Sequence, residues 1–312
     1  MFRIGTTSYI IPADILPNVE FLAPRVDDVQ LVLFETDEYG SNLPDAALRG
    51  RLNELAASHD LTYTVHLPLD LRLGDGGEET HISLVKARRV IEATAELKPF
   101  AYTLHLDGRT LLLPEAEHPE RSGRVVPATQ SKGAQRSSAK DASFDSTPQR
   151  PRTAADVAPL RSGRSGMLSC WQANSRRALE IVCGWLDEPE RLCVENIERW
   201  DPEAFAPIVA ALPVSRTIDI GHLWLQGADP LDHLARWVDR ARVIHLHGIA
   251  ERDHASLAHV PAERLDPVIA LLVERFSGVL TLEVFNQADL ESSQAALAAS
   301  LARHGSDFRR VA

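Results

Sequence analysis

The sequence predicts an α/β protein built as a single (β/α)₈ barrel, and three observations lead to this prediction. Eight short β-rich runs recur along the 312 residues, and each is followed by a segment of helical periodicity or by a loop leading into one. The interiors of the runs are continuously apolar rather than alternating, which is typical of parallel strands covered by helices. Eight such units in one chain of this length indicate a TIM barrel.

The eight predicted strands are rich in β-branched and apolar residues. They span 2–10, 29–35, 62–68, 101–108, 191–198, 215–224, 241–248 and 278–285. Apolar residues recur at three- and four-residue spacing in the predicted helices, which include 45–59, 79–97, 173–186, 229–241 and 265–276. An open doubly wound sheet is the alternative, but no glycine-rich phosphate-binding fingerprint follows the first strand.

One interval interrupts this rhythm after the fourth strand. Residues 118–165 are rich in Ser, Arg, Pro and Ala, with nine basic and four acidic residues and almost no large apolar side chains. Such a segment cannot bury enough apolar surface to order itself, so we expect a disordered basic insertion within the barrel domain. It could be a tolerated surface insertion or a lid over the active site.

Composition narrows the class of protein. The formal net charge of −11 argues against a general nucleic-acid binder, because that class uses a basic surface to neutralise phosphates. Three cysteines, none in a Cys-x-x-Cys pair, are too few for a disulfide framework and fit a reducing cytoplasm. We find no signal sequence and no run of about 18 apolar residues, so we expect a cytoplasmic protein without a membrane span. The oligomeric state is left open.

Candidate functional residues lie where the predicted strands end. In a (β/α)₈ barrel, side chains at the C-terminal strand ends point into the active site. The third to eighth strands carry, in order, His66, His105 with Asp107, Glu195 with Asn196, Asp219 with His222, His245 with His247, and Glu283. Burying so many imidazoles and carboxylates together is costly unless a cation offsets the cost. The set therefore predicts a metal site, and the mixture of N and O ligands without Cys suits Zn²⁺ or Mn²⁺ in a hydrolytic enzyme.

Some candidates have two interpretations. His245 and His247 alternate onto the same face of the seventh strand, and we favour His245 as the ligand. Glu35, at the end of the second strand, is equally compatible with a site role and a structural one. Asp253 and His254, in the loop after the seventh strand, could reach the site or could be solvated surface residues.

Three tryptophans lie just beyond a strand or the insertion: Trp171, Trp200 and Trp224. They could form an apolar platform for a large planar substrate. The alternative is that they pack at the interface between helices and barrel.

The order of strand-end residues resembles the xylose-isomerase-like, AP-endonuclease type 2 superfamily of TIM barrels. The residues that carry this resemblance are His66, His105, Glu195, Asp219, His222, His245, His254 and Glu283. In the endonuclease branch, the resemblance implies that such residues bind up to three zinc ions, which activate water and hold a phosphodiester. The loop motif of that branch is Asp-x-His, whereas here Arg252 stands two residues before His254 and Asp253 is displaced by one. The resemblance therefore implies two or three ions.

Residues 2–35 look like the N-terminus of the bacterial cobamide-remodelling phosphodiesterases, a branch of the same superfamily. This resemblance implies a small-molecule corrinoid substrate, whose nucleotide-loop phosphoester is hydrolysed to cobinamide phosphate and an α-ribazole-type nucleoside. On this hypothesis Glu195, Glu283 and His105 act in catalysis. The residues expected to contact substrate are Glu35, Asp107, Asn196, His247, Trp171 and Trp224.

Other activities remain open at this stage. A sugar isomerase or epimerase of the superfamily would need one metal, which Glu195, Asp219, His245 and Glu283 could hold, leaving His66 and His105 superfluous. An AP-endonuclease-like nuclease and a catalytically silent corrinoid-binding protein are further alternatives. The number of bound ions separates the first of these from a phosphodiesterase.

Overall fold

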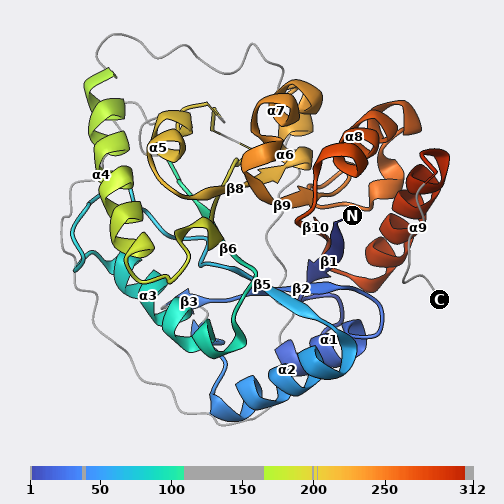
Figure 1. Ribbon diagram of the computed structural model, residues 1–312, viewed down its shortest axis with the longest axis horizontal. Coiled ribbons are helices and arrows are strands. Elements are labelled where there is room, and N and C mark those ends of the chain that lie inside the picture. Colours follow the sequence, from blue (N-terminus) through green and yellow to red (C-terminus); the bar gives the residue numbers. More distant parts are fainter. Residues whose placement is uncertain (1, 37–39, 109–164, 199, 202, 306–312) are drawn as a thin grey trace, which may run out of the picture.

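Eight parallel strands form a closed barrel in the computed structural model of the protein, which describes residues 2–36, 40–108, 165–198, 200–201 and 203–305 (Figure 1). The strands are β1 (Arg3–Thr7), β2 (Asp28–Val32), β5 (Thr62–His66), β6 (Ala101–His105), β7 (Leu192–Glu195), β8 (Ser215–Asp219), β9 (Ala241–Leu246) and β10 (Val279–Leu282). Each pairs with its neighbours in chain order, and β1 closes the barrel by pairing with β10 through Gly5 and Thr281. This confirms the predicted (β/α)₈ barrel.

Helices surround the strands on the outside (Figure 1). They are α1 (Ile15–Leu22), α2 (Ala46–His59), α3 (Ile82–Thr94), α4 (Ser165–Cys183), α5 (Ala206–Ala211), α6 (Ile220–Leu225), α7 (Pro230–Trp237), α8 (Ala262–Arg275) and α9 (Gln287–Arg303). Local sequence accounts for several helix ends. Asp45 accepts a hydrogen bond from the Leu48 amide at the start of α2, and Asn286 accepts one from the Asp289 amide at the start of α9.

The inside of the barrel is apolar at one level and polar above it. Ala101 on β6, Cys193 on β7 and Val243 on β9 form a small buried cluster. Since β9 is not a neighbour of β6 or β7 in the sheet, this cluster spans the interior of the barrel. One step further along the strands, the hydroxyl groups of Thr103 and Thr217 lie 2.9 Å apart across the interior. The larger apolar core lies between the strands and the helices. Apart from Asp28 at the start of β2, the polar side chains inside the barrel are therefore concentrated toward the C-terminal strand ends.

Two details differ from the sequence-based expectation. The run 29–35 ends as a barrel strand at Val32, and Glu35 belongs instead to a two-stranded antiparallel sheet of β3 (Glu35–Thr36) and β4 (Gly40–Ser41). The run 215–224 contains both β8 and α6, because the chain turns into a helix directly after Asp219.

The predicted insertion, residues 118–165, lies outside the described residues except for Ser165, where α4 begins. Within the described part of the chain, no helix has both the length and the hydropathy to cross a membrane.

Candidate metal centre

Glu195 lies at the centre of the predicted ligands, at the end of β7. Its Oε2 lies 3.1 Å from Nε2 of His66 and 3.1 Å from Nε2 of His105, which end the two preceding strands. Its Oε1 lies 2.9 Å from Nδ1 of His245 on β9. These contacts place one carboxylate between two groups of potential ligands, and His66, His105 and Glu195 form the first group, cluster A.

A second group, cluster B, consists of Glu195, Asp219, His245 and Glu283, and all four are buried. Nδ1 of His245 lies 3.1 Å from Glu283 Oε2 and 3.7 Å from Asp219 Oδ2. Each strand from β7 to β10 therefore supplies one potential ligand, within one residue of its end. Clusters A and B share Glu195, so an ion in one would lie close to an ion in the other.

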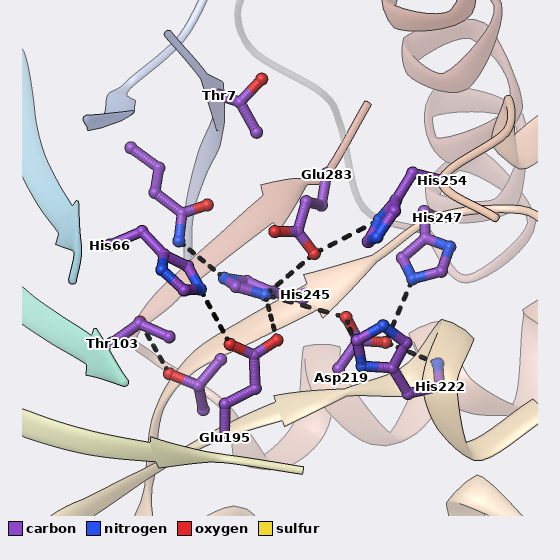
Figure 2. A network of polar contacts seen from close by, with 12 residues as sticks. Thr7, His66, Thr103, Glu195, Asp219, His222, His245, His247, His254 and Glu283 are labelled. Atoms are coloured by element: carbon purple, nitrogen blue, oxygen red, sulfur yellow. Dashed lines mark hydrogen bonds and ion pairs between the residues drawn. The ribbon is translucent and has the colours of Figure 1, made fainter. Parts of the chain in front are cut away.

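A third group, cluster C, consists of His222, His247, Asp253 and His254. Figure 2 shows His66 and Glu195 on one side of His245, and His222, His247 and His254 on the other. His247 Nε2 lies 3.2 Å from Asp219 Oδ1, so cluster C lies directly beside cluster B. The three clusters together contain all eight of the predicted metal ligands, with His247 and Asp253 in addition.

The loop after β9 brings Asp253 and His254 over the strand ends. Gly248 and Ala255 exchange two backbone hydrogen bonds, of 2.8 and 3.0 Å, which fold the loop back on itself. His254 has a φ of +50°, in the left-handed region that few residues other than glycine adopt. This turn lets two consecutive side chains face the same cluster.

Backbone carbonyl groups orient three of the imidazoles. Nδ1 of His66 lies 2.7 Å from the carbonyl oxygen of Leu67, Nδ1 of His222 lies 3.0 Å from that of Asn196, and Nδ1 of His247 lies 3.1 Å from that of Gly248. A carbonyl oxygen only accepts hydrogen bonds, so each Nδ1 carries a proton and Nε2 is the nitrogen left to bind a metal once it is unprotonated. In each case Nε2 also faces a carboxylate of the clusters. This is the arrangement that metal-binding histidines need.

Asn196 fixes the spacing between Glu195 and Asp219. Its side chain donates a 2.9 Å hydrogen bond to the Asp219 carbonyl and accepts a 2.9 Å bond from the Asp219 amide. Both polar atoms of this buried side chain are thus used within the protein. Asn196 therefore has a positioning role, and its expected contact with substrate stays a prediction.

The chemistry of the clusters fits cations. Asp219 Oδ2 and His254 Nδ1 are buried and have no hydrogen-bond partner within the described residues, although they belong to clusters B and C. Glu283 Oε2 and His247 Nε2 are also buried, and they contact His245 and Asp219 of cluster B at 3.1 and 3.2 Å. Unpartnered buried polar atoms are costly, and a bound ion would satisfy Asp219 Oδ2 directly. Nitrogen and oxygen donors without thiolate are typical of Zn²⁺ or Mn²⁺ sites.

The pKa values report the same electrostatic environment. Burial disfavours ionisation of Glu195, but His245 and His105 outweigh it and hold its pKa well below the usual value. Burial lowers the pKa of His222, but Asp219, Glu198 and Asp253 outweigh it and raise this pKa to about 10. Glu283 and Glu195 likewise raise the pKa of His245 above its usual value, against the effect of burial. Without a metal, protons on imidazoles therefore supply the positive charge that the carboxylates require.

Two predicted substrate contacts lie apart from the clusters. Glu35 pairs with Arg89 on α3 at 2.8 Å, and hydrogen bonds from Ser41 and Arg89 lower its pKa. Asp107 is buried just beyond the end of β6, with Oδ2 3.9 Å from Arg72, whose side chain is 45% exposed. Arg72 is a partly exposed cation near the strand ends that the sequence did not single out.

The tryptophans do not form an exposed platform. Trp171 and Trp224 are 2% and 7% exposed, and Trp200 packs edge-to-face against Trp171 with ring centroids 5.4 Å apart. Trp171 also donates a 3.1 Å hydrogen bond to the Asp107 carbonyl. The expectation that Trp171 and Trp224 contact substrate is corrected, because neighbouring side chains cover both rings and leave the packing interpretation.

Sequence reasoning also assigned His247 and Asp253 differently. His247 was expected to contact substrate, but the structure places it in cluster C. Asp253 was left between a ligand and a surface residue, and it too lies in cluster C. The position of His247 could have been inferred from sequence, because His247 and His245 alternate onto one face of the strand. The position of Asp253 could not, because it depends on a loop geometry that has no simple sequence signal.

These features define the class of the protein: a closed (β/α)₈ barrel with three groups of potential metal ligands at its C-terminal strand ends. Solved structures share this fold. A D-tagatose 3-epimerase-like protein is 16% identical, with a TM-score of 0.66 over 97% of this chain and 98% of that chain. Endonuclease IV from Thermus thermophilus is 14% identical, with a TM-score of 0.58 over 96% of this chain and 99% of that chain.

A further Thermus thermophilus protein, soaked with ZnCl₂, is 16% identical, with a TM-score of 0.55 over 97% of this chain and 98% of that chain. At these identities the likeness shows the fold. No protein-family model matches the sequence, and no curated protein matches it. The similar structures include both an epimerase-like protein and an endonuclease. The fold alone does not distinguish these reactions, so the reaction of this protein has to be inferred from the residues of its site.

Proposed function

We propose that the protein is a metal-dependent phosphodiesterase that hydrolyses the nucleotide-loop phosphoester of cobamides. One observation carries the reaction class: the potential ligands form three clusters, of which two share Glu195. A single-metal enzyme needs only one such cluster. Phosphoester hydrolysis, in contrast, uses neighbouring ions to stabilise both the attacking and the leaving oxygen.

Each cluster would hold one ion, with Zn²⁺ favoured by the donor set and Mn²⁺ as the alternative. His66, His105 and Glu195 would hold the first ion, Glu195, Asp219, His245 and Glu283 the second, and His222, His247, Asp253 and His254 the third. When bound, such ions lower the pKa of water and offset the negative charge that develops on phosphoryl oxygens.

The chain contributes the orientation of the groups that would hold the ions. Glu195 faces His66 and His105 with one oxygen and His245 with the other, so it holds clusters A and B at a fixed separation. Asn196 ties Glu195 to Asp219, and the backbone carbonyls keep the Nε2 atoms of His66, His222 and His247 directed at the clusters. Because these groups are held before substrate arrives, little reorganisation is needed during the reaction.

Two observations support a cobamide as the substrate. Residues 2–35 resemble the cobamide-remodelling phosphodiesterases, and the net charge of −11 is unfavourable for a nuclease that must approach duplex DNA. Arg72 and Asp107, near the end of β6, are the residues that we propose contact the polar periphery of the corrinoid. Hydrolysis would add water across the phosphoester, leaving the phosphate on cobinamide and releasing the α-ribazole-type nucleoside.

The direct test is incubation of purified protein with a cobamide. The protein is stripped with a chelator, reloaded with Zn²⁺ or Mn²⁺, and incubated with the cobamide under reducing conditions, and the products are separated by chromatography. We expect cobinamide phosphate and nucleoside in equal amounts from reloaded protein and neither from stripped protein. Unchanged cobamide that stays bound to reloaded protein would support a silent corrinoid binder instead, and cleavage of abasic-site DNA would support a nuclease.

A sugar epimerase is the second candidate, because cluster B alone offers two Glu, one Asp and one His around a single position. The same reloaded protein is therefore incubated with ketoses, and its bound metal is counted. One ion per chain with ketose epimerisation would replace the phosphodiesterase proposal. More than one ion per chain with no epimerisation would support it.

A further inference from the structure

Gln30, in the middle of β2, contacts the metal centre from inside the barrel. Its side chain is fully buried, and its amide nitrogen Nε2 is placed 2.9 Å from Nε2 of His245. Its amide oxygen Oε1 is buried and has no hydrogen-bond partner within the described residues. Two nitrogens thus face each other, while an acceptor oxygen next to them has no donor.

His245 differs from the other oriented imidazoles in the nitrogen it presents to the clusters. Its Nδ1 faces Glu195 at 2.9 Å and Glu283 at 3.1 Å, so Nδ1 is the atom directed at cluster B. A neutral imidazole that coordinates a metal through Nδ1 must carry its proton on Nε2. That N–H then needs an acceptor, as the backbone carbonyls provide for His66, His222 and His247. Gln30 is the group that stands in this position for His245.

Chemistry decides which end of the Gln30 amide faces His245. The amide oxygen and nitrogen have nearly the same size, so their assignment follows from the hydrogen bonds that each can make. Rotating the amide by about 180° lets its oxygen accept the Nε2–H of His245, and the oxygen then no longer lacks a partner. The amide NH₂ then points elsewhere in the interior, where Thr64 pairs in register with Gln30 and Thr281 with His245, and a hydroxyl oxygen can accept a hydrogen bond.

We propose that Gln30 is a positioning residue of the metal centre: its carbonyl oxygen accepts the Nε2–H of His245 and so keeps Nδ1 of His245 unprotonated and directed at cluster B. The inference rests on the proposed metal centre and is independent of the proposed substrate. Partners of this kind fix the ring and the tautomer of a ligand, and their loss typically weakens metal binding about 10- to 100-fold.

The experiment compares three single variants of the full chain. Gln30→Met keeps the size of the side chain but removes the acceptor. Gln30→Glu keeps an acceptor but removes the NH₂ donor. Gln172→Met is the matched control, because it makes the same substitution at a partly buried amide that donates to the Ala204 carbonyl and belongs to none of the clusters.

The measurement is Zn²⁺ affinity of stripped protein, titrated against a chromophoric chelator, with the number of ions per chain and the thermal midpoint of the metal-free form. We expect Gln30→Met to bind one ion about 10- to 100-fold more weakly than the wild type. We expect Gln30→Glu to bind the same ion more tightly than the wild type, because a carboxylate accepts the Nε2–H more strongly than an amide oxygen does, and Gln172→Met to bind all ions with wild-type affinity. If Gln30→Met does not fold, Gln30→Glu alone decides the question, because wild-type or weaker affinity in this variant would contradict the inference.

Two results would overturn the inference: wild-type affinity in Gln30→Met, or wild-type or weaker affinity in Gln30→Glu. A loss in Gln30→Glu as large as in Gln30→Met would mean that the amide acts as a donor. Wild-type protein that binds no Zn²⁺ at all would instead refute the proposed metal centre. Since the readout is metal binding, an incorrect substrate assignment changes none of these outcomes.

Discussion

The carboxylate of Asp253 joins two imidazoles, one on α6 and one directly after β9: Oδ2 lies 3.7 Å from Nε2 of His222, and Oδ1 lies 3.4 Å from Nδ1 of His247. Arg252, which stands where the endonuclease motif has its aspartate, points away and pairs with Asp289 on α9. The loop thus places an acid in cluster C from the neighbouring position. This arrangement is the reason that we propose three ions rather than two.

Replacing Asp253 with asparagine tests the third ion. Burial opposes ionisation of Asp253, but His254, His247 and His222 outweigh it and hold its pKa below the usual value, so the carboxylate is charged at neutral pH. Removing that charge should lower the Zn²⁺ content by one ion per chain and leave two, as measured by elemental analysis after dialysis.

Arg252→Ala is the control for this change. It breaks a surface ion pair, which should cost at most about 1 kcal/mol of stability, and it should leave the Zn²⁺ content as in the wild type. A full complement of ions in Asp253→Asn, or an ion lost in Arg252→Ala, would contradict the assignment of Asp253 to cluster C.

Glu195→Gln should have a larger effect, because Glu195 belongs to two clusters. We expect loss of the ions in clusters A and B and a fall in cobamide hydrolysis of about 10³-fold, equivalent to about 4 kcal/mol of transition-state stabilisation. Glu180→Gln, which breaks only an exposed pair with Arg176 on α4, should change neither quantity. The idea that Glu195 is shared fails if the variant loses a single ion.

The grouping of the strand-end side chains could be predicted from sequence because strand geometry is regular. Alternation along a strand puts every second residue on the inner face, and the C-terminal ends of parallel strands meet at one rim. The close approach of His66, His105, Glu195, Asp219, His245 and Glu283 follows from this rule. The role of Asp253 does not, because it depends on the left-handed backbone at His254 and on the hydrogen bonds between Gly248 and Ala255.

Long-range packing explains the remaining differences. The side chain of Trp171 packs against Gly74 and that of Trp200 against Gly108. These glycines are distant in sequence from the tryptophans, and their lack of a side chain leaves room for the rings to pack inside the protein. Gln30 lies in the middle of a strand run and meets its partner His245 only because β2 and β9, separated by β1 and β10 in the closed barrel, both direct a side chain into its interior. No local pattern in the sequence reports such pairings.

Asp28, inside the barrel on β2, should make stability depend on pH. Burial raises its pKa to about 7, although Thr62 donates a 2.7 Å hydrogen bond to Oδ2. Between the ordinary Asp pKa of 3.8 and 7, the folded protein keeps a proton that the unfolded chain has released, so stability falls as pH rises. An asparagine side chain does not ionise, so Asp28→Asn should gain about 3 kcal/mol relative to the wild type between pH 5 and pH 8.

The measurement is urea unfolding of both metal-free proteins, with chelator present, across this pH range. Contributions from the imidazoles of the clusters cancel in the difference between the two proteins. A difference in unfolding free energy that stays constant with pH would show that Asp28 ionises normally in the folded state.

Gly221, in the first turn of α6, lies against the ring of His247, and a Cβ atom at this position would overlap the ring. Gly221→Ala should therefore displace His247 from cluster C. We expect a stability loss of about 1–3 kcal/mol from overpacking and weaker binding of one Zn²⁺ ion, measured by thermal unfolding and chelator competition.

Gly50→Ala, in α2, is the matched control, because no atom lies within 4 Å of the added Cβ there. Alanine favours a helix over glycine by about 0.5–1 kcal/mol, so this variant should be slightly more stable than the wild type, with unchanged Zn²⁺ affinity. Since both variants make the same chemical change in a helix, the difference between them isolates the contact with His247. Equal Zn²⁺ affinity in the two variants would mean that His247 is not needed to hold an ion in cluster C.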